Sequence, residues 1–402
     1  MSSQERLSTY IDAHFTDLVA FCQRLIQTPS VNGLHPERAL AEVIAAEAKK
    51  LGLTVEFVSQ EDDHPNVIVS TSEQGDVGLL LVGHLDTVGI GDEREWKFPP
   101  FSGTLSAGRI YGRGAVDTKG GMAVSLYALA ALKHTGLLQH GRAQFIGVPD
   151  EETGATGTLG IKVLIREGKL AAKGAIYAYS GDEINIGHRG LLRYEITALG
   201  TTAHSGTNEW QDRKKGKNAV TALSRLLIAL ENLDQEMAYS KIPLFAPYRT
   251  VITPTMIAGG AGINIVPDRA TAFIDIRLTP EYQRAILEPQ LFALGQGITE
   301  QTGCDFEWKL LNEVPAVMSD ENAQIFKVLE QVIPQVKGHS APRTIAGPAN
   351  EGYLLIEHGI PMVCGLGPQG DGAHSANEYV EVQGLRDATL VYALTALGLD
   401  EE

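Results

Sequence analysis

The feature that most constrains this chain is a series of continuous apolar runs that each end in polar residues and alternate with helical segments. The run "GLLLVGHLDTV" (78–88) is typical of a strand buried on both faces, and "GGMAVSLYALAALKHTG" (120–136) predicts a helix. The alternation continues through "AQFIGV", a helix over 158–168 and a strand over 175–180. This pattern predicts an α/β fold with a mainly parallel, twisted sheet flanked by helices.

The pattern changes after Gly190, where apolar and polar residues alternate in "LLRYEITALG" and again in "VPDRATAFIDIRL" (266–278). Such alternation favours an antiparallel sheet with one covered face, and a helix is predicted between the two segments. The strand and helix pattern returns with "PRTIAG" and "IPMVCGLG". We therefore expect an inserted α+β domain over 189–303 and a first domain made of 1–188 and 304–402.

The overall charge excludes some partners. The chain has 33 Lys and Arg against 49 Asp and Glu, a formal net charge of -16, which disfavours nucleic acid as a ligand. No apolar stretch reaches the roughly 20 residues that cross a bilayer. The charged N-terminus "MSSQERLSTYIDAHF" does not resemble a signal peptide, and the three cysteines are far apart, so we expect a cytoplasmic protein with reduced thiols.

Three adjacent carboxylates, in "VPDEETG" (148–154), follow the apolar run "AQFIG". Like charges at the end of a buried strand repel, and their desolvation costs several kcal/mol without a positive partner. The same expected edge of the sheet carries further imidazole and carboxylate groups, which are the ligands that Zn²⁺, Co²⁺ or Mn²⁺ prefer. The candidates are His84 and Asp86 in "GHLDTV", Asp117 in "GRGAVDTKGG", Glu151, Glu152, an acid of "YSGDE" (Asp182 or Glu183) and His374 in "GDGAHSANEYV".

Local geometry suggests which of these groups bind metal directly and which act on a ligand or a water molecule. His84 and Asp86 lie on one face of an extended segment, so Asp86 can accept the second ring N–H of His84. Glycines around Asp117 allow a sharp turn that brings one carboxylate between two ions. Glu151 and Glu152 point to different sides, so one can bind metal while the other faces a water molecule. Any one of these residues alone is more typical of a helix cap or a satisfied polar group, but the combination indicates a metal site.

Together these motifs, with "HRG…AHSG" and "GGAGINIVPD…DIR", resemble the co-catalytic zinc amidohydrolases and peptidases, a family that includes acetylornithine deacetylase, succinyl-diaminopimelate desuccinylase and glutamate carboxypeptidase. The similarity runs in order from about residue 10 to residue 397. It implies a zinc-binding α/β domain, an inserted dimerisation domain, two Zn²⁺ ions per subunit with Co²⁺ or Mn²⁺ as substitutes, and a homodimer. It also implies a cis peptide after Asp117.

The resemblance also implies site roles. Asp117 would bridge the ions, His84 and Asp182 would complete one site, Glu152 and His374 the other, and Glu151 would be the general base. Asp182 is preferred to Glu183 because Gly181-Asp182 best mirrors the Gly-Glu of the family, whose "GEPT" stretch is absent here. In the inserted domain, His204 matches a family histidine that helps to stabilise the oxyanion. Asn264 and Arg277 match residues that bind the substrate.

The expected reaction is metal-dependent hydrolysis of an amide bond in an N-acyl amino acid, with a dipeptidase or carboxypeptidase of the same family as the alternative. In the loop "GPANEG" (347–352), Pro348 and Ala349 offer no side-chain hydroxyl that could bind an acyl carboxylate. This weakens the prediction of a succinyl substrate. A metal-free, peptidase-like binding scaffold is the alternative from another class. Bound metal after growth with zinc distinguishes it from the enzyme.

Overall fold

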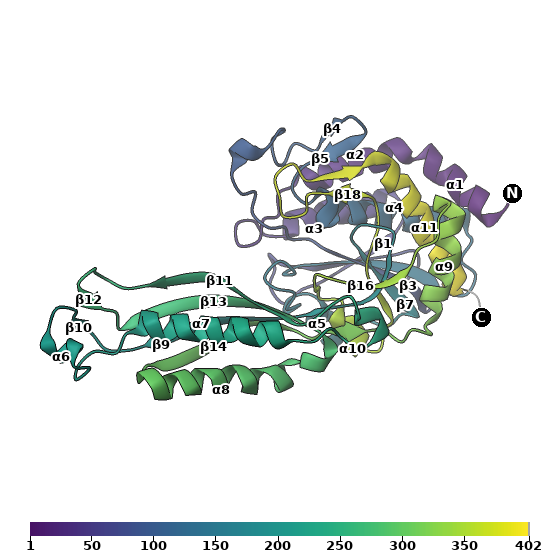
Figure 1. Cartoon of the computed structure of the whole chain (residues 1–402). Helices are drawn as coiled ribbons and strands as arrows, with labels where there is room; N and C mark the ends of the chain where they lie inside the picture. The colour runs from purple at the N-terminus through teal and green to yellow at the C-terminus, as the bar shows by residue number, and fades with distance from the viewer. Residues whose placement is uncertain (401–402) are drawn as a thin grey trace. The chain divides into compact units, whose positions relative to one another are not determined.

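A computed structural model describes residues 1–400 of the chain, which form two compact units (Figure 1). The first unit contains residues 1–188, 318–346 and the segment from Asn350 onward. The second contains residues 189–317 together with Gly347–Ala349. The second unit is thus inserted into the first along the sequence, and each is described in turn.

The first unit is built on a six-stranded sheet with the order β1-β2-β6-β3-β7-β17. Strands β6, β3, β7 and β17 run parallel, and β2 joins β6 in an antiparallel pair, as β1 does with β2. Every residue of β3 is buried, which explains its continuous apolar sequence. The predicted mainly parallel sheet is confirmed. The strands are β1 (Thr54–Val58), β2 (Asn66–Ser70), β3 (Val77–His84), β6 (Arg142–Val148), β7 (Gly174–Ala178) and β17 (Met362–Leu366).

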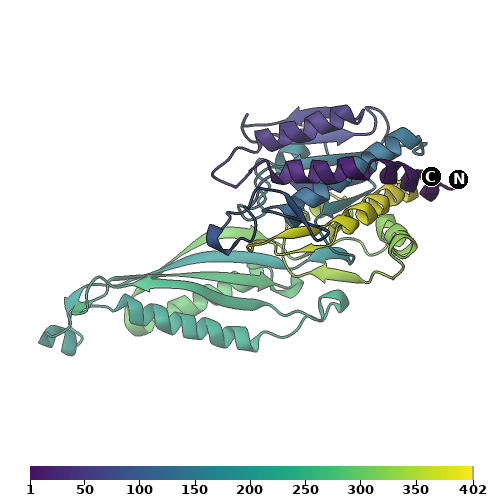
Figure 2. The same cartoon turned by 90° about the horizontal axis from the view of Figure 1, so that it is seen from above.

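Helix α4 lies at the centre of the helical layers. It is buried throughout 120–132, so it is apolar all round, and it packs against α1, α2, α11 and strands β3 and β6. The N-terminal helices and α11 lie side by side in Figure 2. Within residues 1–400, no helix combines the length and the hydropathy that a membrane span requires. The helices are α1 (Ser3–Ala13), α2 (Phe15–Ile26), α3 (Arg38–Lys50), α4 (Gly120–Thr135), α5 (Ile161–Arg166), α9 (Gln324–Lys337), α10 (Tyr353–Glu357) and α11 (Val382–Asp400).

Two small sheets complete the first unit. One pairs β8 with β16 in parallel, and β15 joins it where the chain returns from the second unit. The other is antiparallel, with the order β18-β19-β5-β4, and the loop between β18 and β19 carries His374. Their strands are β4 (Thr104–Ser106), β5 (Arg109–Tyr111), β8 (Ile184–His188), β15 (Val317–Met318), β16 (Arg343–Ala346), β18 (Gly370–Asp371) and β19 (Tyr379–Glu381).

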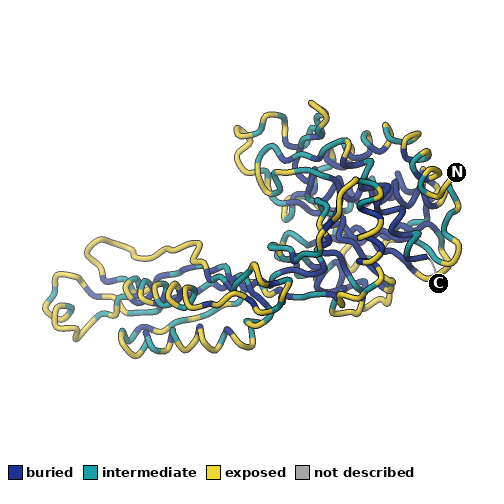
Figure 3. Tube along the Cα trace, turned by 45° about the vertical axis from the view of Figure 1, so that its right-hand side comes forward, coloured by how far each residue is buried: buried dark blue, intermediate teal, exposed yellow. Residues whose placement is uncertain are grey.

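The second unit is a four-stranded antiparallel sheet, β11-β13-β9-β14, against which α7 and α8 pack. Alternate residues of β13 are buried, as the sequence alternation predicts, and the exposed faces of both helices are yellow in Figure 3. We expected the inserted segment to end at residue 303, but β14 pairs with β9 and extends it to Val317. The elements are β9 (Gly190–Leu199), β10 (Ala203–His204), α6 (Asn208–Gln211), α7 (Ala219–Glu236), β11 (Val251–Gly259), β12 (Ile265–Val266), β13 (Arg269–Leu278), α8 (Arg284–Thr302) and β14 (Asp305–Val314).

Candidate metal centre

The fold brings polar residues to the carboxyl ends of two neighbouring strands. His84 is the last residue of β3, and its register partner across the parallel pair is Val148, the last residue of β6. Glu151 and Glu152 follow Val148 within four residues. Because parallel strands end at the same edge of a sheet, these groups meet where ligands of such sheets bind.

Asp117 enters the site from the short turn Ala115–Lys119 that precedes α4. A Cβ atom on Gly121 would lie 1.7 Å from the carbonyl oxygen of Ala178, so only glycine lets the start of α4 approach the end of β7 this closely. The close approach places the turn at the edge of the sheet where β3 ends. The Asp117–Thr118 peptide is cis, as the resemblance implies.

The carboxylate of Asp117 lies between two imidazoles. Its Oδ1 is 2.7 Å from Nε2 of His84, and its Oδ2 is 3.1 Å from Nε2 of His374. Nε2 of His374 is also 3.2 Å from Oε1 of Glu152. Ligand atoms of His84, Asp117 and Glu152 all lie within 4.8 Å of one another. Two imidazoles and two carboxylates at such distances match the donor set of zinc, so the residues present fit a divalent ion.

Asp86 is fully buried and acts differently from our expectation. Nδ1 of His84 bonds to the backbone oxygen of Asp86 at 2.8 Å, whereas the Asp86 carboxylate is 3.6 Å away. That carboxylate instead accepts the backbone N–H groups of Glu151 (3.2 Å) and Glu152 (2.9 Å), and the side-chain amide of Asn32 (2.9 Å). Asp86 therefore fixes the segment that carries both glutamates, and the backbone, not the carboxylate, orients the His84 ring.

The surroundings of Glu151, His374 and Asp117 shift the pKa of each group. Burial raises the pKa of Glu151 to about 8, the negative charges of Glu152 and Asp117 add to the shift, and His84 opposes it. The hydrogen bonds of His374 to Asp117 and Glu152 raise its pKa to about 10. Burial works against ionisation of Asp117, but His84 and His374 outweigh it and lower the pKa of Asp117. In the metal-free protein, burial thus favours the protonated form of Glu151, whereas His84 and His374 favour the ionised form of Asp117.

A buried ion pair holds the turn that carries Asp117. Glu378 accepts from Nη1 of Arg113 (2.7 Å) and from the backbone N–H groups of Gly114 (2.9 Å), Val116 (2.9 Å) and Asp117 (3.1 Å). The Arg113 and Glu378 side chains are 2% and 0% exposed. Glu378 lies four residues after His374 in "GAHSANEYV", but its role depends on contacts with residues 113–117 that the motif letters do not show.

Asp182 lies outside this cluster. Its carboxylate bonds to Nζ of Lys337 on α9, and its Oδ2 is 3.4 Å from Nε2 of His339. Glu183, the alternative, is exposed and accepts from Oγ1 of Thr344 at 3.3 Å. The structure therefore does not bring the expected third carboxylate to His84. The reason is that α9 supplies a mostly buried lysine that pairs with Asp182.

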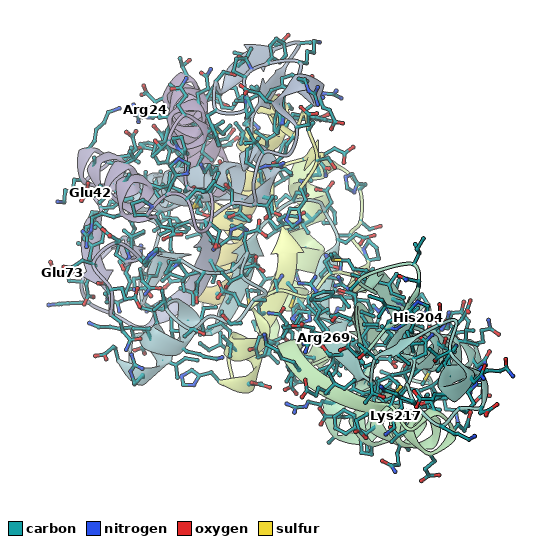
Figure 4. The ribbon with its side chains drawn as sticks, turned by 90° about the vertical axis from the view of Figure 1, so that its left-hand side faces the viewer. Arg24, Glu42, Glu73, His204, Lys217 and Arg269 are labelled. Atoms are coloured by element: carbon teal, nitrogen blue, oxygen red, sulfur yellow. The ribbon has the colours of Figure 1, made fainter. Side chains whose placement is uncertain are left out.

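The remaining predicted residues belong to the second unit, where Figure 4 labels His204. Nδ1 of His204 accepts the N–H of Gly206 at 3.1 Å, and Nε2 is 3.4 Å from Nδ2 of Asn264. Arg277 donates to Asp275 on its own strand at 2.7 Å. The structure brings His204 and Asn264 together and gives Arg277 an acidic partner.

The parallel sheet, the inserted α+β unit and the imidazole–carboxylate cluster define a class of metallohydrolase. Residues 80–398 match the model of Peptidase family M20/M25/M40, so the chain belongs to this family and is a hydrolase.

Relatives cover nearly the whole chain. It is 28% identical, over 95% of its length and 94% of the relative's, to N-formyl-4-amino-5-aminomethyl-2-methylpyrimidine deformylase of Halalkalibacterium halodurans. It is 25% identical to succinyl-diaminopimelate desuccinylase of Blochmanniella pennsylvanica, over 94% and 97% of the two chains. Among solved structures, an M20 family metallo-carboxypeptidase from Sulfolobus solfataricus superposes with a TM-score of 0.76 at 21% identity, covering 95% and 99%. These likenesses confirm the predicted fold and family.

Metal binding should displace protons from the site. With a pKa of about 10, His374 is protonated at pH 7 in the metal-free protein, and its Nε2 must lose the proton to bind an ion. We expect zinc affinity to rise by about tenfold per pH unit between pH 6 and 8 for each proton displaced. Calorimetry in buffers of different ionisation enthalpy counts the protons. Affinity that does not change with pH would contradict the assigned role of His374.

Proposed function

We propose that this chain hydrolyses the amide bond of an N-acyl amino acid and releases a small acid. The observation that carries the proposal is the position of Glu151, which directly precedes Glu152 of the metal-binding cluster and whose backbone N–H is held by the Asp86 carboxylate. The similarity to a deformylase and a desuccinylase supports an acyl group on nitrogen as the target. A dipeptidase or carboxypeptidase is the second candidate, because two solved relatives in fold are a metallo-carboxypeptidase and a carnosine dipeptidase.

His374, Asp117, Glu152 and His84 would hold the metal. A bound divalent ion lowers the pKa of a water molecule to about 7 and polarises the substrate carbonyl. Zinc is the proposed native ion, with Co²⁺ or Mn²⁺ as substitutes, and two ions per subunit follow from the resemblance. A Bacillus subtilis protein of the same fold, 17% identical with a TM-score of 0.70, is described as a dinuclear metal-binding peptidase.

Glu151 carries the proton through the reaction. Its carboxylate accepts a proton from the attacking water and later gives that proton to the leaving amine. Asp86 keeps Glu151 in place through the backbone N–H of that residue. His204 is the proposed donor to the oxyanion, and such a donor typically contributes about 3 kcal/mol.

Substrate recognition is assigned to Asn264 and Arg277. Arg277 shares Asp275 with Arg193, whose Nε lies 3.0 Å from that carboxylate, so two guanidinium groups face one acid. The surplus positive charge suits a substrate carboxylate. The loop at 347–352 contains no hydroxyl side chain, which favours a small acyl group such as formyl or acetyl over succinyl.

A homodimer is part of the proposal. Strand β11 is an edge of the second unit's sheet and exposes Met256 and Ile257, at 63% and 59%. An apolar edge strand favours pairing with a second copy. Sedimentation of the intact chain measures this, and an active monomer would contradict a role for His204 in a partner's site. A cytoplasmic location stays a prediction of the sequence.

The proposal is tested with metal-stripped protein, assayed with and without added zinc or cobalt. The substrates are N-formyl, N-acetyl and N-succinyl amino acids and a set of dipeptides. We expect metal-dependent release of formate or acetate. Cleavage of dipeptides alone would favour the second candidate. No turnover despite confirmed metal binding would contradict both.

A further inference from the structure

We propose that the hydroxyl of Tyr179 is a second hydrogen-bond donor to the oxyanion that forms when the amide bond is attacked. The inference rests on the proposed hydrolysis and adds a catalytic residue to it. Tyr179 directly follows β7, which lies next to β3 in the sheet, and β3 ends at His84. It belongs to the same compact unit as the metal-binding cluster. The phenol therefore lies at the edge of the sheet where ligands of parallel sheets bind.

The hydroxyl of Tyr179 is available to a ligand. Within residues 1–400 it has no hydrogen-bond partner, although the hydroxyl of a buried tyrosine usually finds one. It is not a fully buried atom either, so solvent reaches it. The nearby Tyr177 differs, because its side chain is 2% exposed and its hydroxyl lies 3.3 Å from Oε1 of Glu351. Tyr177 thus uses its hydroxyl inside the core, whereas Tyr179 keeps a donor unused at the surface of the site.

The charged groups of the cluster act on this phenol. Burial raises the pKa of Tyr179, and the negative charge of Asp117 adds to the shift. Glu378 and Glu152 raise the pKa further, and His84 opposes them. Interactions between charges weaken with distance, so their combined effect places the phenol beside the cluster. Because its pKa is raised, Tyr179 is a neutral donor at pH 7 and adds no negative charge next to a developing oxyanion.

Close backbone approaches hold Tyr179 in place. A Cβ atom on Gly367 would lie 2.6 Å from the carbonyl oxygen of Tyr179, just as one on Gly121 would meet that of Ala178. The aromatic ring lies against Gly365 of β17, where a Cβ atom would be 3.7 Å from Cδ1 of the ring. The start of α4 and the end of β17 therefore fix the backbone that carries the phenol. A donor that is already fixed needs no rearrangement when negative charge develops.

The hydrogen bond belongs to one step of the reaction. As water forms a bond to the carbonyl carbon, the electron pair of the carbonyl π bond moves to the oxygen, which becomes negative. Tyr179 donates its O–H to that oxygen and keeps its proton, while Glu151 takes the proton of the water. When the carbon–nitrogen bond breaks, the carbonyl forms again and the hydrogen bond weakens. Because the interaction is strongest in the transition state, its loss should lower kcat and leave KM unchanged.

Tyr179→Phe, which removes only the hydroxyl, tests the inference in the zinc-loaded full chain. We expect kcat to fall by about 10²–10³-fold, the loss typical of one oxyanion donor, with zinc content and thermal unfolding unchanged. The control is Tyr111→Phe, in the same unit, because the Tyr111 ring stacks at 5.1 Å on Phe98 and at 5.6 Å on Tyr379, and phenylalanine keeps these contacts. Its kcat should not change. An unchanged kcat in Tyr179→Phe, or a rise in KM alone, would overturn the inference.

A binding measurement separates the inference from the proposed function. The probes are N-methylphosphonyl derivatives of the amino acids in the substrate panel, in which an anionic tetrahedral phosphorus replaces the acyl carbon. We expect Tyr179→Phe to weaken probe binding by the same factor as kcat/KM and to leave binding of the free amino acid unchanged. Equal affinity of both chains for the probes would overturn the inference. No turnover of the panel by the unmodified chain would instead overturn the proposed function.

Discussion

Replacing Glu151 with Gln should lower kcat by about 10²–10⁴-fold, because the amide cannot accept the proton of the attacking water. Zinc content should stay unchanged, since the ligand atoms that gather in the site come from His84, Asp117, Glu152 and His374. The measurements are steady-state kinetics on the substrate that the panel of N-acyl amino acids and dipeptides identifies, and metal analysis of the purified variant. Full turnover with normal metal content would show that Glu151 is not the general base.

Glu183→Gln is the matched control, because Glu183 is an exposed glutamate outside the cluster, and the activity of this variant should be unchanged.

The pH dependence of stability gives a second measurement on Glu151→Gln. In the metal-free protein, Glu151 has a pKa of about 8 when folded and about 4.5 when unfolded. The folded state therefore binds more protons between these values, and its stability falls as pH rises from about 4.5 to 8. Glu151→Gln should reduce this fall.

Replacing Glu378 with Gln should lower the free energy of unfolding by about 3–5 kcal/mol, because Arg113 is left as a buried charge without its partner. The amide also has one acceptor oxygen where the carboxylate accepts from three backbone N–H groups. Asp117 should lose its fixed position, and zinc affinity should fall by about 10–100-fold, the cost typical of outer ligand partners. Urea unfolding and chelator competition measure the two effects.

The control for Glu378→Gln is Glu381→Gln in the same segment. Glu381 pairs with Arg109 at 3.4 Å, and both side chains are 42% exposed, so its removal should cost about 0–1 kcal/mol and leave zinc affinity unchanged. Equal losses in the two variants would show that the buried pair has no special role. If Glu378→Gln folds too poorly to assay, added zinc should raise its melting temperature, because the ion binds only the folded chain.

The sheet and most of the candidate cluster could be predicted because their signals are local. The apolar run of β3 ends at His84, and the acids of "VPDEETG" follow β6, so strand ends and polar residues coincide in the sequence. Parallel pairing then places them at one edge. No contact in space had to be known to group these residues.

The features that sequence reasoning missed depend on distant partners. Asp182 resembles a ligand locally, but its partner Lys337 is 155 residues further along the chain. Strand β14 was assigned to the first domain because its pairing with β9 is not visible in its own sequence. Glu378 is bonded to backbone groups of a turn in which Gly114 has a φ of 82°, a geometry that motif letters do not show.

The segment from His374 to Glu378 supplies both a metal ligand and the acceptor that fixes the turn of Asp117, which lies 261 residues earlier. Chains are synthesised from the N-terminus, so His84, Asp117 and Glu152 leave the ribosome before the inserted unit and well before His374. Until that segment has been synthesised, Asp117 lacks the imidazole of His374 and the acceptor that fixes its turn. The turn that carries Asp117 therefore acquires its acceptor only after the whole inserted unit has been synthesised.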